Sequence, residues 1–86
     1  MRKMEYNSNK NVISKQLKIS RVKAGLSQTE LAARLQVMNV NMDQQMISKI
    51  ENNTRIVTDY ELACICEVLK VDLKTMLSDF YDNLSK

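Results

Sequence analysis

The chain has 86 residues, of which 44% are hydrophobic and 27% are charged, with one glycine and no proline. This length holds one domain with one core, and the composition excludes a disordered chain and a turn-rich β fold, so an all-α fold is expected. The formal net charge of +3 is small for a nucleic-acid-binding protein, which makes its distribution more informative than its total.

The N-terminal part of the chain predicts an arm followed by a helix. Residues 1–11 are polar, rich in asparagine and without apolar periodicity, so we expect a flexible arm there. From Ile13 to Ala24, positions spaced by three and four residues are apolar apart from Arg21, which predicts a first helix. Gly25 is expected to end this helix, because glycine readily adopts the left-handed conformation of a C-terminal cap.

A capping box marks the start of a second helix. In Ser27-Gln-Thr-Glu30 the serine oxygen can accept a hydrogen bond from the third residue on, and the glutamate can accept one from the serine N–H. The predicted helix runs from Gln28 to about Met38. In the connection that follows, Val40 and Met42 are expected to enter the core. The apolar stripe of this helix consists of Leu31, Ala32 and Leu35.

Similar signals predict three further helices. Asp43 is a candidate N-cap for a helix over residues 44–51, and Asn52-Asn53 is expected to close it. The capping box Thr58-Asp-Tyr-Glu61 opens a fourth helix, and Asp72 caps a fifth. Residues 80–86 form a C-terminal tail that either extends the fifth helix or packs back on the domain. Its large apolar residues are Phe80, Tyr81 and Leu84.

From Leu17 to Leu77 the sequence resembles the Cro and phage-repressor family of helix-turn-helix proteins, also called the XRE type. The resemblance implies a five-helix, lambda-repressor-like domain over residues 12–79. Its second and third helices would form the DNA-binding unit, with the third in the major groove. The matching residues are Arg21, Gly25-Leu-Ser-Gln-Thr-Glu-Leu-Ala32, Ile47-Ser-Lys-Ile-Glu-Asn52 and Leu69-Lys-Val-Asp-Leu73.

The resemblance also implies roles for individual residues. Arg21 and Glu51 would form a structural ion pair, because both stand in otherwise apolar stripes. The residues expected to contact base edges are Gln44, Gln45, Ser48 and Lys49. Those expected to contact the DNA backbone are Lys23, Gln28, Thr29, Asn52 and Arg55.

Physical reasoning supports the base-contacting set independently. These positions lie opposite Ile47 and Ile50 or at the exposed N-terminal end of the helix. Glutamine can pair bidentately with adenine, and lysine can donate to guanine, each pair discriminating by about 1–3 kcal/mol. By itself, Gln-Gln-x-x-Ser-Lys is more often a solvated helix face than a DNA-binding one. The DNA-binding interpretation is favoured because this segment follows the second predicted helix in the sequence.

The sequence departs from the family pattern in the connection between Leu35 and Ile47. That connection is roughly five residues longer than usual, since such turns take about three or four residues. A rotated third helix that presents Met46 and Ser48 is therefore the alternative register. Asn53 stands where the family favours glycine, and Lys70 stands where a glycine often ends the fourth helix.

Charge is distributed unevenly along the chain. Residues 1–34 carry eight Lys and Arg against two acidic residues, whereas residues 56–86 carry three against six. The N-terminal part is therefore expected to face phosphate. A basic segment is often no more than a soluble surface, so this charge alone does not predict DNA binding.

The sequence contains no motif that is typical of catalysis, metal binding or membrane insertion. It lacks paired carboxylates, a His-based constellation, an activated nucleophile and a phosphate loop, so we expect no enzyme, no cofactor and no small-molecule ligand. Cys64 and Cys66, without histidine, supply too few ligands for zinc and are expected to stay reduced. No apolar run reaches the roughly 20 residues of a membrane span, and a secretory signal is lacking, so a cytoplasmic location is expected.

Two functional hypotheses follow from the sequence. The first is a sequence-specific regulator of transcription, specifically a repressor, that binds double-stranded DNA as a homodimer. The second is a protein-interaction module, such as an antitoxin-like or anti-repressor subunit. Steep salt dependence of binding to random duplex would favour the first.

Overall fold

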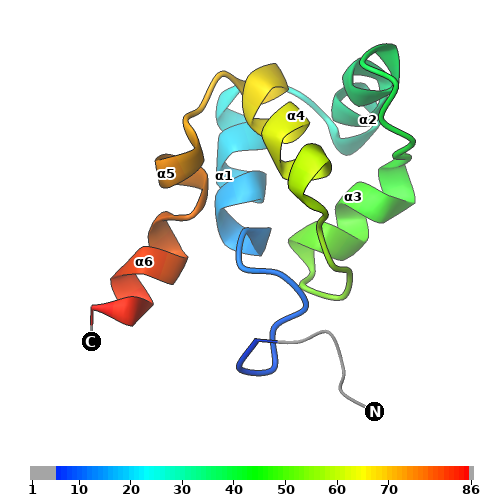
Figure 1. Cartoon of the computed structure of the whole chain (residues 1–86). Helices are drawn as coiled ribbons and strands as arrows, with labels where there is room; N and C mark the ends of the chain where they lie inside the picture. The colour runs from blue at the N-terminus through cyan, green and yellow to red at the C-terminus, as the bar shows by residue number, and fades with distance from the viewer. Residues whose placement is uncertain (1–5, 86) are drawn as a thin grey trace.

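Six helices and no strand form within residues 6–85, the part of the chain that the computed structural model describes (Figure 1). They are α1 Ser14–Lys23, α2 Gln28–Val37, α3 Gln44–Glu51, α4 Asp59–Leu69, α5 Leu73–Met76 and α6 Ser78–Leu84. The all-α prediction is confirmed, but the predicted number of five helices is wrong. The additional helix, α6, starts directly after Leu77, which also ends α5.

Side-chain caps fix the predicted helix starts. Ser27 and Thr58 both form complete capping boxes, and Asp43 and Asp72 accept hydrogen bonds from backbone N–H groups at 2.9 and 2.7 Å. Four helices are followed by left-handed residues that redirect the chain, as their positive φ angles show. These residues are Gly25 at 74°, Asn39 at 65°, Asn53 at 61° and Lys70 at 57°.

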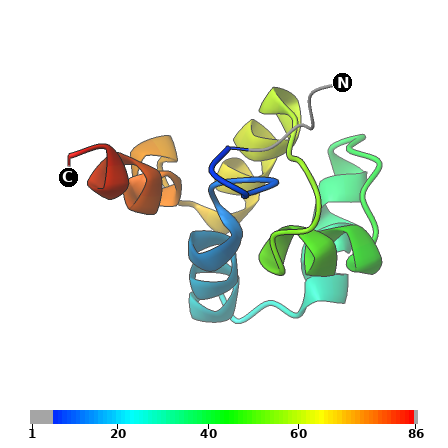
Figure 2. The ribbon, with the colours of Figure 1, turned by 90° about the horizontal axis from the view of Figure 1, so that it is seen from below.

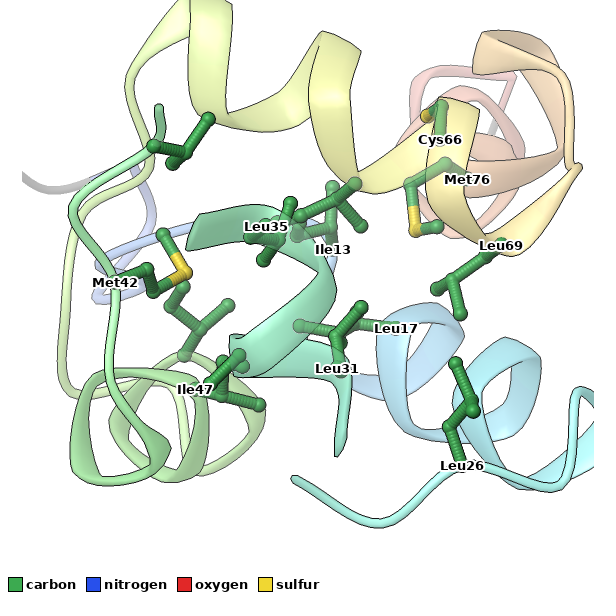
Figure 3. Packing of buried hydrophobic residues seen from close by; sticks show 14 residues of the cluster. Ile13, Leu17, Leu26, Leu31, Leu35, Met42, Ile47, Cys66, Leu69 and Met76 are labelled. Carbon is green, nitrogen blue, oxygen red and sulfur yellow. The ribbon is translucent and has the colours of Figure 1, made fainter. Parts of the chain in front are cut away.

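One core joins the first five helices, and close-up sticks show how its side chains converge (Figure 3). Met42 from the α2–α3 connection is fully buried, and Val40 is 3% exposed, so their predicted entry into the core is confirmed. Burial of such side chains is the main favourable term in folding. The largest fully buried side chains are Leu17, Leu31, Leu35, Met42, Ile47, Ile50, Ile65 and Met76.

The α2–α3 connection is an ordered turn despite its length. Helix α2 ends at Val37, one residue before the predicted Met38, and Asn39 then reverses the chain with a φ of 65°. The Gln36 side-chain amide donates to the Met42 carbonyl at 3.0 Å. The extra residues therefore form a fixed extension beyond α2, and α3 packs against both α2 and α1.

Both ends of the described chain make contacts with other parts of the domain. In the segment expected to be a flexible arm, Lys10 and Asn11 are hydrogen-bonded to the end of α3 and to the residue Asn53 that follows it. Residues 1–5 of that arm lie outside the described residues. Most of the expected tail is helical in α6, where the rings of Phe80 and Tyr6 meet edge to face at 5.4 Å. The arm and the tail thus contact each other.

Several properties outside the core bear on function. Among residues 6–85, no helix is long and apolar enough to cross a membrane, and no three potential metal ligands cluster. Cys64 and Cys66 are free thiols. Burial raises the pKa of the Cys66 thiol, which keeps it protonated and unreactive at neutral pH.

Candidate nucleic-acid interface

Helix α3 separates a buried face from an exposed one. Ile47 and Ile50 are fully buried against α1 and α2, whereas Gln44, Gln45 and Lys49 are exposed. The N-cap Asp43 holds the first turn of the helix in place. Ser48 is half-buried beside them. The structure therefore brings the four predicted base-contacting residues onto one side of α3.

A chain of hydrogen bonds holds the side chain of Gln44 in position. Its Nε2 donates to Oε1 of Gln28 at 2.6 Å, and Nε2 of Gln28 donates to Oε1 of Glu51 at 3.1 Å. Glu51 in turn accepts two hydrogen bonds from Arg21, at 2.6 and 3.1 Å. Four residues from three helices thus form one continuous network.

The expected ion pair between Arg21 and Glu51 lies at the base of this network. The side chains are only 11% and 4% exposed, and Arg21 also donates to the Leu26 carbonyl at 2.8 Å. The hydrogen bond with Glu51 raises the pKa of Arg21 above its ordinary value, and burial opposes this without reversing it. The charge at this site is therefore permanent, and the pair fixes the end of α3 against α1.

The network shows how α3 is rotated relative to α2. The side chains of Gln28 and Gln44 touch although the chain between them is unusually long. Met46 is half-buried and packs against the core, whereas the glutamines occupy the exposed N-terminal end of α3. Their contact with base edges stays a prediction.

The predicted backbone contacts are in different situations. Lys23, Thr29 and Asn52 are exposed. Gln28 is half-buried, and both of its polar atoms are engaged by Gln44 and Glu51. The guanidinium of Arg55 is also engaged, since it donates two hydrogen bonds to a buried glutamate.

That glutamate, Glu61, forms a second ion pair that the sequence analysis missed. Its carboxylate lies 3.0 Å from Arg55 Nη1, is 4% exposed, and also accepts from the Thr58 N–H as part of the capping box. The capping box identified Glu61 but did not indicate its partner. A buried carboxylate requires a counter-charge, and a nearby arginine was the available signal.

This pair predicts a pH dependence. Burial acts to raise the pKa of Glu61, but the hydrogen bonds from Arg55 and Thr58 outweigh it and hold the pKa below its ordinary value of 4.5. Because the folded pKa is depressed, the stabilisation is complete above about pH 4.5 and is lost as the pH falls through the folded pKa.

We therefore expect Glu61→Gln to be less stable than the wild type at neutral pH. The difference should shrink as the pH falls below about 4.5, the ordinary pKa of a glutamate. Urea unfolding at a series of pH values measures the free energy of unfolding of both proteins. A difference that stays constant as the pH is lowered would contradict a depressed pKa of Glu61.

An apolar cavity of about 430 Å³ lies apart from the predicted site residues. It is bounded by the N-terminal segment, the α3–α4 loop, the first turn of α4 and the end of α5, and its lining includes Val12, Ile56, Leu62 and Leu77. Of the predicted site residues, none lines it. The sequence offered no sign of this cavity, because its walls come from four separate segments.

Comparison with known protein families agrees with a helix-turn-helix arrangement. The profile of the helix-turn-helix family HTH_3 matches residues 17–75, which span most of α1 through α5. Among curated proteins, none matches the chain significantly by sequence. The matched region covers more than half of the chain and contains the complete α2–α3 unit. The chain therefore belongs to the XRE/Cro-type helix-turn-helix family HTH_3, whose domain implies DNA binding.

Proposed function

We propose that this protein is a sequence-specific transcriptional repressor that places α3 in the major groove of double-stranded DNA. The observation that carries the proposal is the network from Arg21 to Gln44. It fixes a polar, uncharged side chain at the exposed N-terminal end of α3, in a family whose domain binds DNA. A preorganised side chain loses little conformational entropy on binding.

The chemistry of Gln44 suits adenine. One Nε2 hydrogen points to Gln28, which leaves the second hydrogen and Oε1 for a base edge. An amide that donates to N7 and accepts from the N6 amino group matches adenine in the major groove. Gln45 offers the same groups, and Lys49 with Ser48 extends the contact along the helix.

Phosphate contacts would flank these base contacts. Thr29 lies in the first turn of α2, where backbone N–H groups favour anions, and Asn52 follows the last residue of α3. Lys23 supplies a charge at the end of α1. Gln28 keeps one amide hydrogen for a phosphate. Arg55 contributes as a neighbouring charge, because Glu61 occupies its guanidinium.

Titration of labelled duplexes tests the proposal. We expect the protein to bind random duplex with an affinity that falls steeply with salt, because each neutralised phosphate contributes about 0.9 to the slope of log K against log salt. A selected operator should bind about 10³-fold tighter or more. No binding to any duplex at low salt, together with a tight protein partner, would instead support an interaction module.

Assembly on a two-fold operator is part of the proposal, with α6 as the contact. Tyr81 and Leu84 are 45% and 56% exposed on this helix, whereas Phe80 is already in contact with Tyr6. A single module of this size buries only about 600–1,000 Å² on DNA, so a second copy would add affinity.

We therefore expect Tyr81→Ser combined with Leu84→Ser to convert dimers to monomers and to weaken operator binding. Analytical ultracentrifugation measures the first effect and a DNA titration the second. Val37→Ser is the matched control, because Val37 is 84% exposed at the end of α2. If the double variant keeps the stoichiometry of the wild type, α6 is not the dimer contact.

A further inference from the structure

The side chain of Asn53, at the end of α3, holds the N-terminal segment, residues 6–11. Oδ1 of Asn53 accepts hydrogen bonds from the N–H groups of Lys10 and Asn11, at 2.9 and 3.1 Å, and its Nδ2 donates to Oδ1 of Asn9. Asparagine tolerates the φ of 61° found here. It therefore ends the helix as glycine would and also holds a second segment.

Asn11 adds a second fastening. Its Nδ2 donates to the carbonyls of Ile50 and Arg55, both at 3.0 Å, and its Oδ1 accepts from the Ile13 N–H at 3.0 Å. One side chain thus joins the last turn of α3, the loop that follows and the start of α1. The N-terminal segment consequently has a fixed position relative to α3.

The outermost part of this segment is a tight turn, which we call the Asn7–Ser8 tip. Tyr6 and Asn9 exchange two backbone hydrogen bonds of 2.8 Å, and the two residues between them have φ angles of 49° and 70°. Both tip residues are exposed. The ring of Tyr6, at one end of the turn, also contacts the ring of Phe80. The tip is therefore an ordered, polar turn.

The segment and α3 lie on the same side of the molecule. Figure 1 shows the segment below the end of α3 and the loop that follows it, and Figure 2, seen from below, shows neither the segment nor α3 covered by another helix. A duplex that receives α3 in its major groove therefore has the polar residues 6–11 beside it.

We propose that the Asn7–Ser8 tip is a further contact to the DNA backbone, next to the groove that receives α3. Amide, hydroxyl and backbone N–H groups of this kind are common phosphate ligands, and they hold the register without recognising sequence. The inference rests on the proposed DNA-binding function, which it extends by a second surface. It also gives a reason for Asn53, which positions the tip.

A charge series at Asn7 tests this inference. Asn7→Lys should lower Kd by about twofold to fivefold and Asn7→Asp should raise it similarly, as exposed charge pairs do. Operator and random duplex should change alike, and the lysine should steepen the salt slope by about 0.9. The chain already holds Lys70 at a φ of 57°, so lysine is compatible with such a turn.

Asn39 provides the matched control. It is an exposed asparagine with a φ of 65° in the turn after α2, and Figure 1 shows that turn well apart from the N-terminal segment. At about 0.15 M salt, charges are screened beyond about 8 Å. Asn39→Lys and Asn39→Asp alter net charge equally but should change Kd by less than the same changes at Asn7.

A second variant tests the role of Asn53. Asn53→Gly keeps the left-handed end of α3 but removes the side-chain hydrogen bonds of Asn53 to the segment. Asn7→Lys in this background should therefore lose part of its gain in affinity, since Asn11 still holds the segment. Equal effects at Asn7 and Asn39, with normal binding by the wild type, would overturn this inference alone. A wild type that binds no duplex would overturn the proposed function as well.

Discussion

Replacement of Gln44 by alanine is expected to weaken operator binding by about 1–3 kcal/mol, or roughly 5- to 150-fold in Kd. Binding to random duplex should hardly change, because a neutral amide that contacts a base releases no counterion. Gln45→Ala should behave in the same way. Fluorescence anisotropy with the selected operator and a scrambled duplex measures both quantities. Equal losses on the two duplexes would mean that neither glutamine contacts a base edge.

The hydrogen bond between Gln28 and Gln44 adds a sharper test. If Gln28 orients Gln44, Gln28→Ala should remove part of the same binding energy, and the double variant should lose less than the two single losses combined. Additive losses would mean that the two side chains act independently on DNA. Gln36→Ala is a suitable control, because Gln36 also bridges α2 to the start of α3 but bonds to the Met42 carbonyl.

Glu51→Ala should be the most destabilising of the changes considered, by about 3 kcal/mol. The substitution leaves the Arg21 guanidinium without its counter-charge, and this side chain is only 11% exposed in the wild type. Loss of one partner of a buried ion pair costs about 3–5 kcal/mol. In a domain of this size the melting temperature should fall by roughly 12–24 °C. Thermal unfolding followed by circular dichroism measures this fall.

The matched control is Glu67→Ala. Glu67 is an exposed glutamate on α4, so its loss should change stability by less than about 0.5 kcal/mol. A Glu51 variant that melts with the wild type would show that the ion pair does not hold α3 in place. The network below Gln44 would then lose its structural basis.

Local chemistry explains why most helices could be predicted from the sequence. The caps at Ser27, Asp43, Thr58 and Asp72 act within three residues, so their effect is visible in the sequence itself. Helix α6 was not predicted because it lacks such a cap. Its preceding residue, Leu77, offers no side-chain hydrogen bond.

Contacts between distant residues explain most of what could not be predicted. Asn53 suggested only a helix end, because its hydrogen bonds to residues 9–11 span more than 40 positions. The sequence suggested phosphate as the partner of Arg55, whereas in the structure Arg55 forms an ion pair with the buried carboxylate of Glu61. The contact between Gln44 and Gln28 likewise could not be predicted, since the connection between them is unusually long.

Selection of bound duplexes from a random pool tests the central claim, sequence-specific recognition through α3, most directly. We predict enrichment of a short motif, repeated with two-fold symmetry at a spacing of about 34–36 Å or a multiple of it. The enriched half-site should contain an adenine whose contribution to affinity disappears in Gln44→Ala. A pool that binds without enrichment of any motif would contradict sequence-specific recognition by this protein.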